Sequence, residues 1–227
     1  MNRTLNRGLA VVAGVLVLSM LAGLGPRPRD PWVFRCVLDD NPRMVVLALG
    51  EDLWASYDAH TCRFDKFWRG DVDFKGSVWD DVHGPQPESV GDTLTYGPLE
   101  DRWKLRRSGH DFETTTQFLG YSIIDDQCHL HYRLSGGGGS VWVTEIPEVR
   151  VEEDRVIFSR TFRIVDGPRS FLTDVRVRAM VGDSQLTILH NEEPVEDEAE
   201  GQQFHRVLLP QNADTVIDVI FDLDGGA

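Results

Sequence analysis

The sequence predicts an all-β fold, an antiparallel β-sandwich preceded by an N-terminal hydrophobic signal or anchor segment. Two observations after residue 31 lead to this fold class. Apolar and polar residues alternate with a period of two over many short stretches, which is typical of strands that bury one face. Turn-forming residues separate these stretches, and short strands joined by turns are typical of antiparallel sandwiches and barrels.

The N-terminal residues have the layout of an export signal. Arg3 and Arg7 precede an uncharged apolar run over residues 9–24, and a helix-breaking, charged segment follows at 25–31. The run is a little shorter than the roughly 20 residues that span a bilayer, so a cleaved signal and an uncleaved anchor both stay open. We therefore expect a signal peptide or membrane anchor at 1–31 and a single sandwich domain at 32–227. The expected location is periplasmic or secreted, with membrane contact only through the N-terminal segment.

The strands are expected where the alternation is clearest, at 32–38, 44–49, 53–58, 63–68, 141–146, 156–165, 172–181 and 215–223. In the stretch 156–165 the inward residues are expected to be Val156, Phe158, Phe162 and Ile164. In the stretch 172–181 they are expected to be Val175, Val177, Ala179 and Val181. The segment 135–140 joins two strand patterns through four consecutive glycines, which predicts a mobile hairpin loop.

The charge and the absent motifs exclude several classes of function. The chain has 23 basic and 37 acidic residues. Four arginines and one aspartate lie in 1–31, which leaves 19 basic and 36 acidic residues, a formal charge of −17 for 32–227. This charge repels phosphate backbones, so nucleic acid is not an expected partner. The sequence has no G-x-S-x-G, H-E-x-x-H, Walker loop or C-x-x-C-H, and we assign it no cofactor and no catalytic residue.

Cysteines and histidines form the pattern closest to a metal site. His60 with Cys62, and His129 with His131, are two residues apart, a spacing that places two side chains on one face of a strand. Together with Cys128 they are candidate ligands for zinc or copper. In an exported protein, Cys62 and Cys128 are equally candidates for a disulfide, and separately placed thiols are a third reading. Cys36 is expected to be a buried thiol.

An aromatic segment supplies the candidate binding residues. Aromatic faces beside carboxylates and amides hold sugar rings, although aromatic residues also fill sandwich cores. The two prolines and the glycine of the stretch 83–87 predict a stiff loop beside these aromatics. The candidate binding residues are Trp54, Tyr57, Asp58, Trp68, Trp79, His83 and Gln86.

Several ordered motifs carry a family resemblance. They are Pro31-Trp32-Val33-Phe34-Arg35, residues 43–49, Asp52-Leu53-Trp54, Tyr57-Asp58, residues 66–70, residues 82–87 and Phe118-Leu119-Gly120-Tyr121. With these motifs, most of 31–222 resembles the N-terminal β module of large exported c-type cytochromes and of sorbosone or glucose dehydrogenase-like propeller proteins from planctomycetes, verrucomicrobia and related bacteria. In those proteins haem and sugar-oxidation chemistry lie in other domains, and no C-x-x-C-H or propeller sequence is present here. The resemblance implies no catalytic residues for the module.

These observations together predict a non-catalytic extracytoplasmic β-sandwich module in an envelope-associated redox or polysaccharide system. Its expected partner is a c-type cytochrome, a propeller dehydrogenase or a carbohydrate. One alternative is a sugar-acting enzyme that uses carboxylates of the segment 58–86, because glycoside hydrolysis needs a pair of carboxyl groups. Another is a metal or haem accessory protein built on the histidine and cysteine pairs.

Overall fold

The computed structural model describes residues 32–74, 85–97, 103–178, 186–194 and 204–222. Contacts divide the chain into two compact units, Met1–Asp30 and Pro31–Ala227, and all described residues belong to the second. The expected signal or anchor therefore lies outside the described residues. In the part of the chain that is described, no helix is long and apolar enough to cross a membrane.

The described residues form sixteen strands, and all their pairings are antiparallel. The all-β antiparallel prediction is confirmed. A five-stranded sheet follows chain order and contains β1 (Trp32–Leu38), β2 (Asn41–Ala48), β3 (Leu53–Asp58), β4 (Arg63–Asp73) and β5 (Glu88–Tyr96). The predicted bounds of the first and third of these strands are the observed ones.

The other strands form a large and a small sheet. The seven-stranded sheet has the order β14 (Glu193–Pro194), β13 (Leu186–His190), β16 (Thr215–Asp222), β11 (Arg155–Asp166), β10 (Gly139–Val151), β9 (Gln127–Gly136) and β8 (Thr115–Ile124). The four-stranded sheet has the order β15 (Phe204–Leu209), β12 (Leu172–Arg178), β6 (Trp103–Arg107) and β7 (His110–Phe112).

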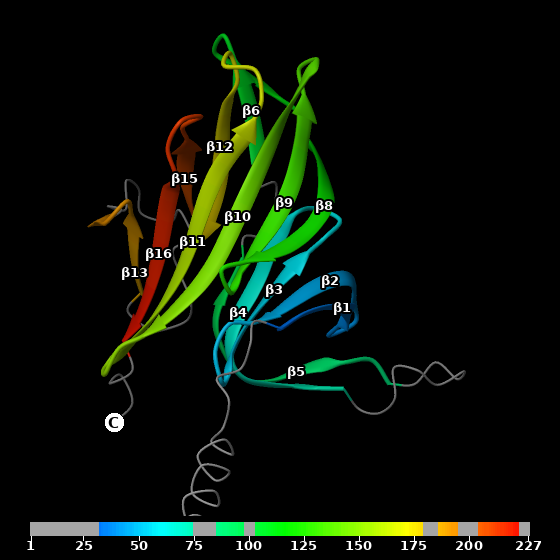
Figure 1. Cartoon of the computed structure of the whole chain (residues 1–227), viewed down its shortest axis with the longest axis vertical. Coiled ribbons are helices and arrows are strands. Elements are labelled where there is room, and N and C mark those ends of the chain that lie inside the picture. The colour runs from blue at the N-terminus through cyan, green and yellow to red at the C-terminus, as the bar shows by residue number, and fades with distance from the viewer. Residues whose placement is uncertain (1–31, 75–84, 98–102, 179–185, 195–203, 223–227) are drawn as a thin grey trace, which may run out of the picture. The chain divides into compact units, whose positions relative to one another are not determined.

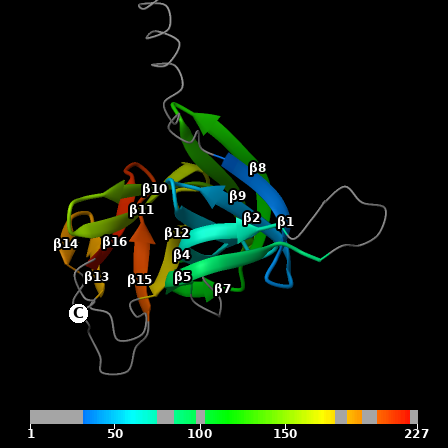
Figure 2. The same ribbon diagram turned by 90° about the horizontal axis from the view of Figure 1, so that it is seen from below.

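One hydrophobic core joins the three sheets in a sandwich-like arrangement. Phe67 of β4 stacks on Phe158 of β11, with ring centroids 4.5 Å apart, and Trp103 of β6 meets Phe162 of β11 at 6.0 Å. The seven-stranded sheet therefore faces both smaller sheets. Figure 1 shows its long strands, green to red, in front of the fainter β12 and β15; Figure 2 gives the view from below.

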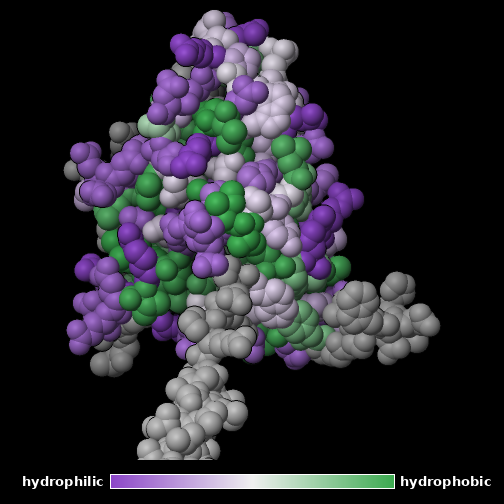
Figure 3. All heavy atoms as spheres, viewed as in Figure 1, coloured by the Kyte–Doolittle hydropathy of each residue, from purple (hydrophilic) through white to green (hydrophobic). Residues whose placement is uncertain are grey.

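The predicted inward faces agree with this core wherever the structure describes them. In β11 the four predicted inward residues are at most 8% exposed, and in β12 Val175 is 1% exposed. The side chain of Val177 and residues 179 and 181 lie outside the description. The outer face of the seven-stranded sheet carries Ile146 and Ile157, both 6% exposed, and Figure 3 shows hydrophobic residues interspersed with hydrophilic ones on this side.

A second core lies on the other face of the five-stranded sheet. Trp54 stacks on Trp68 at 6.2 Å, among Leu38, Met44, Val46, Ala48 and Val72. The turn after β1 reaches the segment before β5, where the Asp39 N–H donates to the Pro87 carbonyl at 3.1 Å. The Asp39 carboxylate also accepts hydrogen bonds from the Ser89 N–H and the Lys66 ammonium. The sheet thus curls until its first turn meets its last strand.

The glycine-rich segment forms a tight hairpin. β9 ends at Gly136 and β10 begins at Gly139, and these two residues pair across the ladder. Only Gly137 and Gly138 form the turn, with φ values of 57° and 77°, the left-handed pair that a two-residue turn of this kind requires. The predicted hairpin is present, but most of its expected loop belongs to the strands.

Candidate functional site

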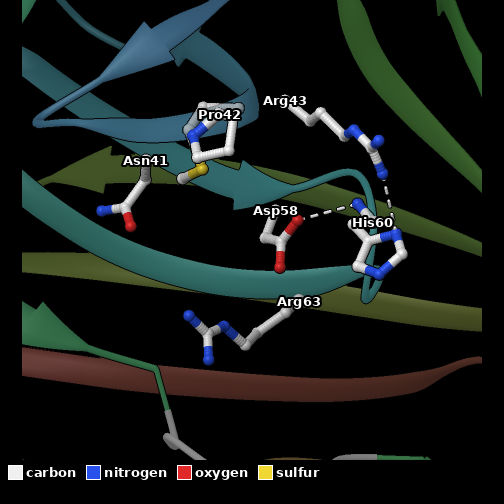
Figure 4. Close-up of a pocket in the computed structure, with 7 residues that line it drawn as sticks. Asn41, Pro42, Arg43, Asp58, His60 and Arg63 are labelled. Carbon is white, nitrogen blue, oxygen red and sulfur yellow. Dashed lines mark hydrogen bonds between the residues drawn. The ribbon is translucent and has the colours of Figure 1, made fainter.

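A surface pocket lies where the start of β2 meets the turn between β3 and β4. Its volume is about 270 Å³. Figure 4 shows its polar side chains arranged around Asp58, with Arg43 and Arg63 on opposite sides of it. The lining residues are Asn41, Pro42, Arg43, Met44, Asp58, His60 and Arg63.

A β-bulge positions Arg43. Leu38 pairs with Asn41 and Cys36 pairs with Met44, so Pro42 and Arg43 together oppose a single residue of β1. Such an extra residue bends the strand and redirects its side chains. Arg43 has a φ of 63°, a left-handed conformation that is uncommon for a residue with a long side chain. Its carbonyl accepts a hydrogen bond from the Ala59 N–H at 3.0 Å, which ties the bulge to the neighbouring turn.

The turn after β3 holds the other polar groups. The Asp58 carboxylate accepts hydrogen bonds from the His60 N–H at 2.7 Å and from the Thr61 hydroxyl at 2.6 Å. Aspartate commonly stabilises a turn in this way. Both oxygens of the carboxylate therefore have partners within the turn.

Arg43 and His60 contact each other across the pocket rim. Arg43 Nη1 lies 3.1 Å from His60 Nδ1 (Figure 4). A guanidinium only donates, so Nδ1 accepts and a neutral ring carries its proton on Nε2. The pair leaves an imidazole N–H and further guanidinium N–H groups at the pocket as donors.

The sequence-predicted aromatic residues lie in the cores. Trp54, Tyr57 and Trp68 are at most 1% exposed. The two indole N–H groups donate to the carbonyls of Gly70 and Asp71 at 3.0 and 3.1 Å, so these polar atoms are satisfied inside the protein. These three side chains fill the interior and present no surface to a ligand.

The remaining candidates are separated from one another. Asp58 lines the pocket, and Gln86 is exposed next to the curled end of the five-stranded sheet. Trp79 and His83 lie outside the described residues. Among the candidate binding residues that the structure describes, only Asp58 lines the pocket, beside His60 from the candidate metal set.

The candidate metal ligands do not converge. Cys62 lies in a turn with a φ of 52°, so the expected strand geometry of His60 and Cys62 is wrong. His129 and His131 do share a face of β9, opposite the buried Cys128. Both ring nitrogens of His131 have partners, Thr144 Oγ1 at 3.1 Å and Ser122 Oγ at 2.9 Å. Within the described ranges, no group of three or more His, Cys, Asp and Glu residues could hold a metal ion.

All three cysteines are free thiols in the structure, which agrees with separately placed thiols and not with the candidate disulfide between Cys62 and Cys128. Burial raises the pKa of Cys62 and of Cys128 to about 12, and that of the half-buried Cys36 to about 11. The negative charge of Glu145 adds to the rise at Cys128.

A buried polar network joins the five- and seven-stranded sheets, and the sequence reasoning missed it. Glu145 of β10 is fully buried and accepts hydrogen bonds from Arg160 Nε at 2.6 Å, the Tyr57 hydroxyl at 2.9 Å and the Tyr132 hydroxyl at 3.1 Å. The Arg160 guanidinium lies 4.9 Å above the Phe64 ring and 5.0 Å above the Phe162 ring. Burial and the nearby Glu145 carboxylate raise the pKa of both tyrosines. Burial acts to lower the pKa of Arg160, but the combined effects of Glu145, Tyr57 and Tyr132 outweigh burial and raise it.

A sequence signal for this network existed. Arg160 falls in register with Phe158 and Phe162, and Glu145 with Val141 and Val143. A charged residue at an inward position on each of two strands indicates a buried ion pair. The pair is enclosed by the core, so we assign it to the stability of the fold.

Comparison with protein-family models gives no match, and comparison with curated proteins gives none. The fold and the site thus define the protein only as an antiparallel all-β domain with a small surface pocket lined by arginines.

Proposed function

We propose that the protein is a non-catalytic extracytoplasmic β-sandwich module that binds carbohydrate through the pocket between β2 and the β3–β4 turn. The observation that carries this proposal is the composition of the pocket. Donors from Arg43, His60 and Asn41 lie beside an apolar wall formed by the exposed Pro42 ring, with Met44 buried beneath the pocket. Small-molecule sites combine an apolar surface with a few placed polar groups in this manner.

The sequence supports the location and the biological setting of this proposal. The export layout of residues 1–31 supports a location outside the cytoplasm, as a secreted, periplasmic or tethered protein. The resemblance to modules of exported cytochromes and propeller dehydrogenases suggests such a protein as a partner in an envelope redox or polysaccharide system.

A glycan array with the purified exported protein tests the proposal. We expect wild type to bind at least one glycan and an Asn41→Ala, His60→Ala variant to lose that binding. His110→Ala is the matched control, because it removes an exposed histidine from β7 in another sheet. Normal thermal melts of both variants are the condition for the comparison. An array without any bound glycan, or equal binding by wild type and the double variant, would refute the proposal.

A pull-down with the same three proteins tests the partner. We expect a c-type cytochrome or a propeller dehydrogenase from the producing organism to be retained by wild type. Retention of neither class would leave carbohydrate binding standing and remove the redox partner from the proposal.

A further inference from the structure

We infer that the carbohydrate bound in this pocket is acidic, and that Arg43 binds a sugar carboxylate. This inference rests on the proposed function and deepens it, because it names the ligand class of the same site. Three independent features of the pocket carry it: its two arginines, the backbone that holds Arg43, and the arrangement of donors beside the apolar wall.

Two arginines line this pocket of an otherwise acidic domain. Residues 32–227 have a formal charge of −17. The pocket lining contains two arginines, Arg43 and Arg63, and a single carboxylate, Asp58. Arg63 also lies 3.9 Å from the Asp65 carboxylate. Asp58 already accepts two hydrogen bonds from its own turn. A site with two arginines on an acidic surface is selective, because the surrounding field repels anions that make no specific contact.

The backbone fixes Arg43 in an uncommon conformation. Its φ of 63° lies in the left-handed region, and residues held there by their surroundings occur preferentially at binding sites. Here the β-bulge and the hydrogen bond from Ala59 to the Arg43 carbonyl hold the residue. The bulge thus directs the guanidinium to the pocket rim instead of along the strand.

Donors at the pocket match a carboxylate. A guanidinium has five N–H groups in a planar fork that fits a carboxylate with two parallel hydrogen bonds. One of the Arg43 N–H groups contacts His60. His60, as an acceptor of that bond, presents Nε2–H as a further donor.

The remaining lining favours a sugar over a peptide carboxylate. A pyranose ring has an apolar face of C–H groups and an edge of hydroxyl groups. The exposed Pro42 ring supplies an apolar wall, and the Asn41 amide supplies both a donor and an acceptor at the same pocket. The side-chain carboxylates of an acidic peptide would contact the arginines but would leave the apolar ring and the amide without a matching group.

The experiment compares acidic oligosaccharides with their neutral counterparts. The probes are oligogalacturonate, oligoalginate and hyaluronan oligomers, each beside its carboxyl-reduced form, and oligoglutamate as the acidic peptide. Binding to the full exported protein is measured by calorimetry at low and high salt. We expect at least one acidic glycan to bind at least about tenfold more tightly than its reduced form. Its affinity should fall as salt rises.

Variants assign the effect to Arg43. Arg43→Asn removes the charge with a residue that tolerates the left-handed backbone, and it should lower the affinity for the acidic glycan at least about tenfold. Arg169→Gln, in the exposed segment between β11 and β12, removes an equal charge elsewhere and should not change the affinity. An unchanged affinity in Arg43→Asn would overturn the inference.

The outcomes separate the inference from the proposed function. Equal binding of acidic and reduced glycans, lost in the Asn41→Ala, His60→Ala variant, would overturn the acidic ligand and keep the carbohydrate module. Binding of oligoglutamate as tight as that of the best glycan would overturn the saccharide. Binding of none of these probes would overturn the inference, and the glycan array would then decide the proposed function on its own.

Discussion

Glu145 and Arg160 place two opposite charges inside the core of the domain. Each of the two side chains is at most 5% exposed, and the two tyrosine hydroxyls complete the coordination of the carboxylate. Removing two charges from water opposes folding, and mutual attraction with good hydrogen bonding offsets this loss. Each residue therefore contributes to stability mainly by compensating the buried charge of its partner.

Breaking the pair from one side should destabilise the protein strongly. We expect Glu145→Gln to lower the free energy of unfolding by about 3–5 kcal/mol, because Arg160 is left as an uncompensated buried charge. Glu145→Gln combined with Arg160→Met should lose less than the sum of the single variants. Urea denaturation measures these differences. Arg163→Gln is the control, because it breaks the exposed ion pair with Asp214, and it should lower the free energy of unfolding much less. Additive losses in the double variant would contradict the coupling between Glu145 and Arg160.

The three thiols, including that of the half-buried Cys36, should be unreactive in the folded protein. The thiolate is the reactive form, and the pKa values of about 11 for Cys36 and about 12 for Cys62 and Cys128 leave very little of it at neutral pH. We expect a thiol-alkylating reagent at pH 7.5 to label the three cysteines only after denaturant is added. Mass spectrometry without reduction gives a second measurement. Linked peptides of Cys62 and Cys128 would show that these two residues form a disulfide.

At the level of the strands, the curled end of the five-stranded sheet depends on one carboxylate. Asp39 is partly buried, which alone would raise its pKa, but hydrogen bonds from Lys66 and Ser89 outweigh burial and lower it. The folded state therefore binds the proton of this group less tightly than the unfolded chain does. The contribution of Asp39 to stability is complete above its ordinary pKa of 3.8 and disappears as the pH falls through the lower, folded value.

The Asp39→Asn variant should reveal this linkage. We expect wild type to be more stable than the variant at pH 7 and pH 5, and the difference to shrink as the pH is lowered below about 4. Guanidinium denaturation over this pH series measures it. A difference that stayed constant down to pH 2.5 would show that the carboxylate makes no specific contribution.

The strand patterns show where sequence reasoning succeeds and where it ends. The bounds of β1 and β3 were predictable because clear alternation is followed by polar turn residues. The expected end of the fourth strand at Trp68 was wrong, because β4 continues to Asp73. Its Gly70 lies opposite Gly91 of β5, where a side chain would approach the Val90 carbonyl to 2.0 Å. The glycines that indicated a turn are needed for close contact between strands.

The pocket was predictable only in part for a related reason. Asp58 and His60 were singled out from the sequence, but they were assigned to different sites. A bulge and the strand register bring Arg43 next to these two residues in the pocket, and neither feature can be recognised from the local sequence. Two interpretations of the aromatic residues were possible, sugar binding and core packing, and the second is correct for Trp54, Tyr57 and Trp68. Burial of large apolar side chains is the dominant favourable contribution to folding.

Across the whole domain, the two cores share one sheet. Phe67 and Trp68 are neighbours in β4, yet Phe67 belongs to the core between the sheets and Trp68 to the core inside the curled sheet. Trp54 and Ala55 of β3 divide between the cores in the same way. Neither core can therefore be exposed without moving strands that the other one needs.

We expect this arrangement to produce a single cooperative unfolding transition. Two of the six tryptophans, Trp54 and Trp68, lie in the second core and contribute its share of the fluorescence signal, whereas far-ultraviolet circular dichroism reports all the strands. The two signals should give the same midpoint in denaturant. An earlier fluorescence transition would mean that the curled sheet opens independently.

The glycine-rich hairpin has a practical consequence for anyone who engineers this protein. The segment 135–140 resembles the flexible linkers at which affinity tags and reporter domains are commonly inserted. In the folded protein a side chain at Gly136 would approach the Glu113 carbonyl to 2.6 Å, and one at Gly139 would approach the Phe171 ring to 2.7 Å. The turn itself has no spare residue. Inserted sequence would separate β9 from β10 at a packed corner, and a protease would find little extended chain to cleave there.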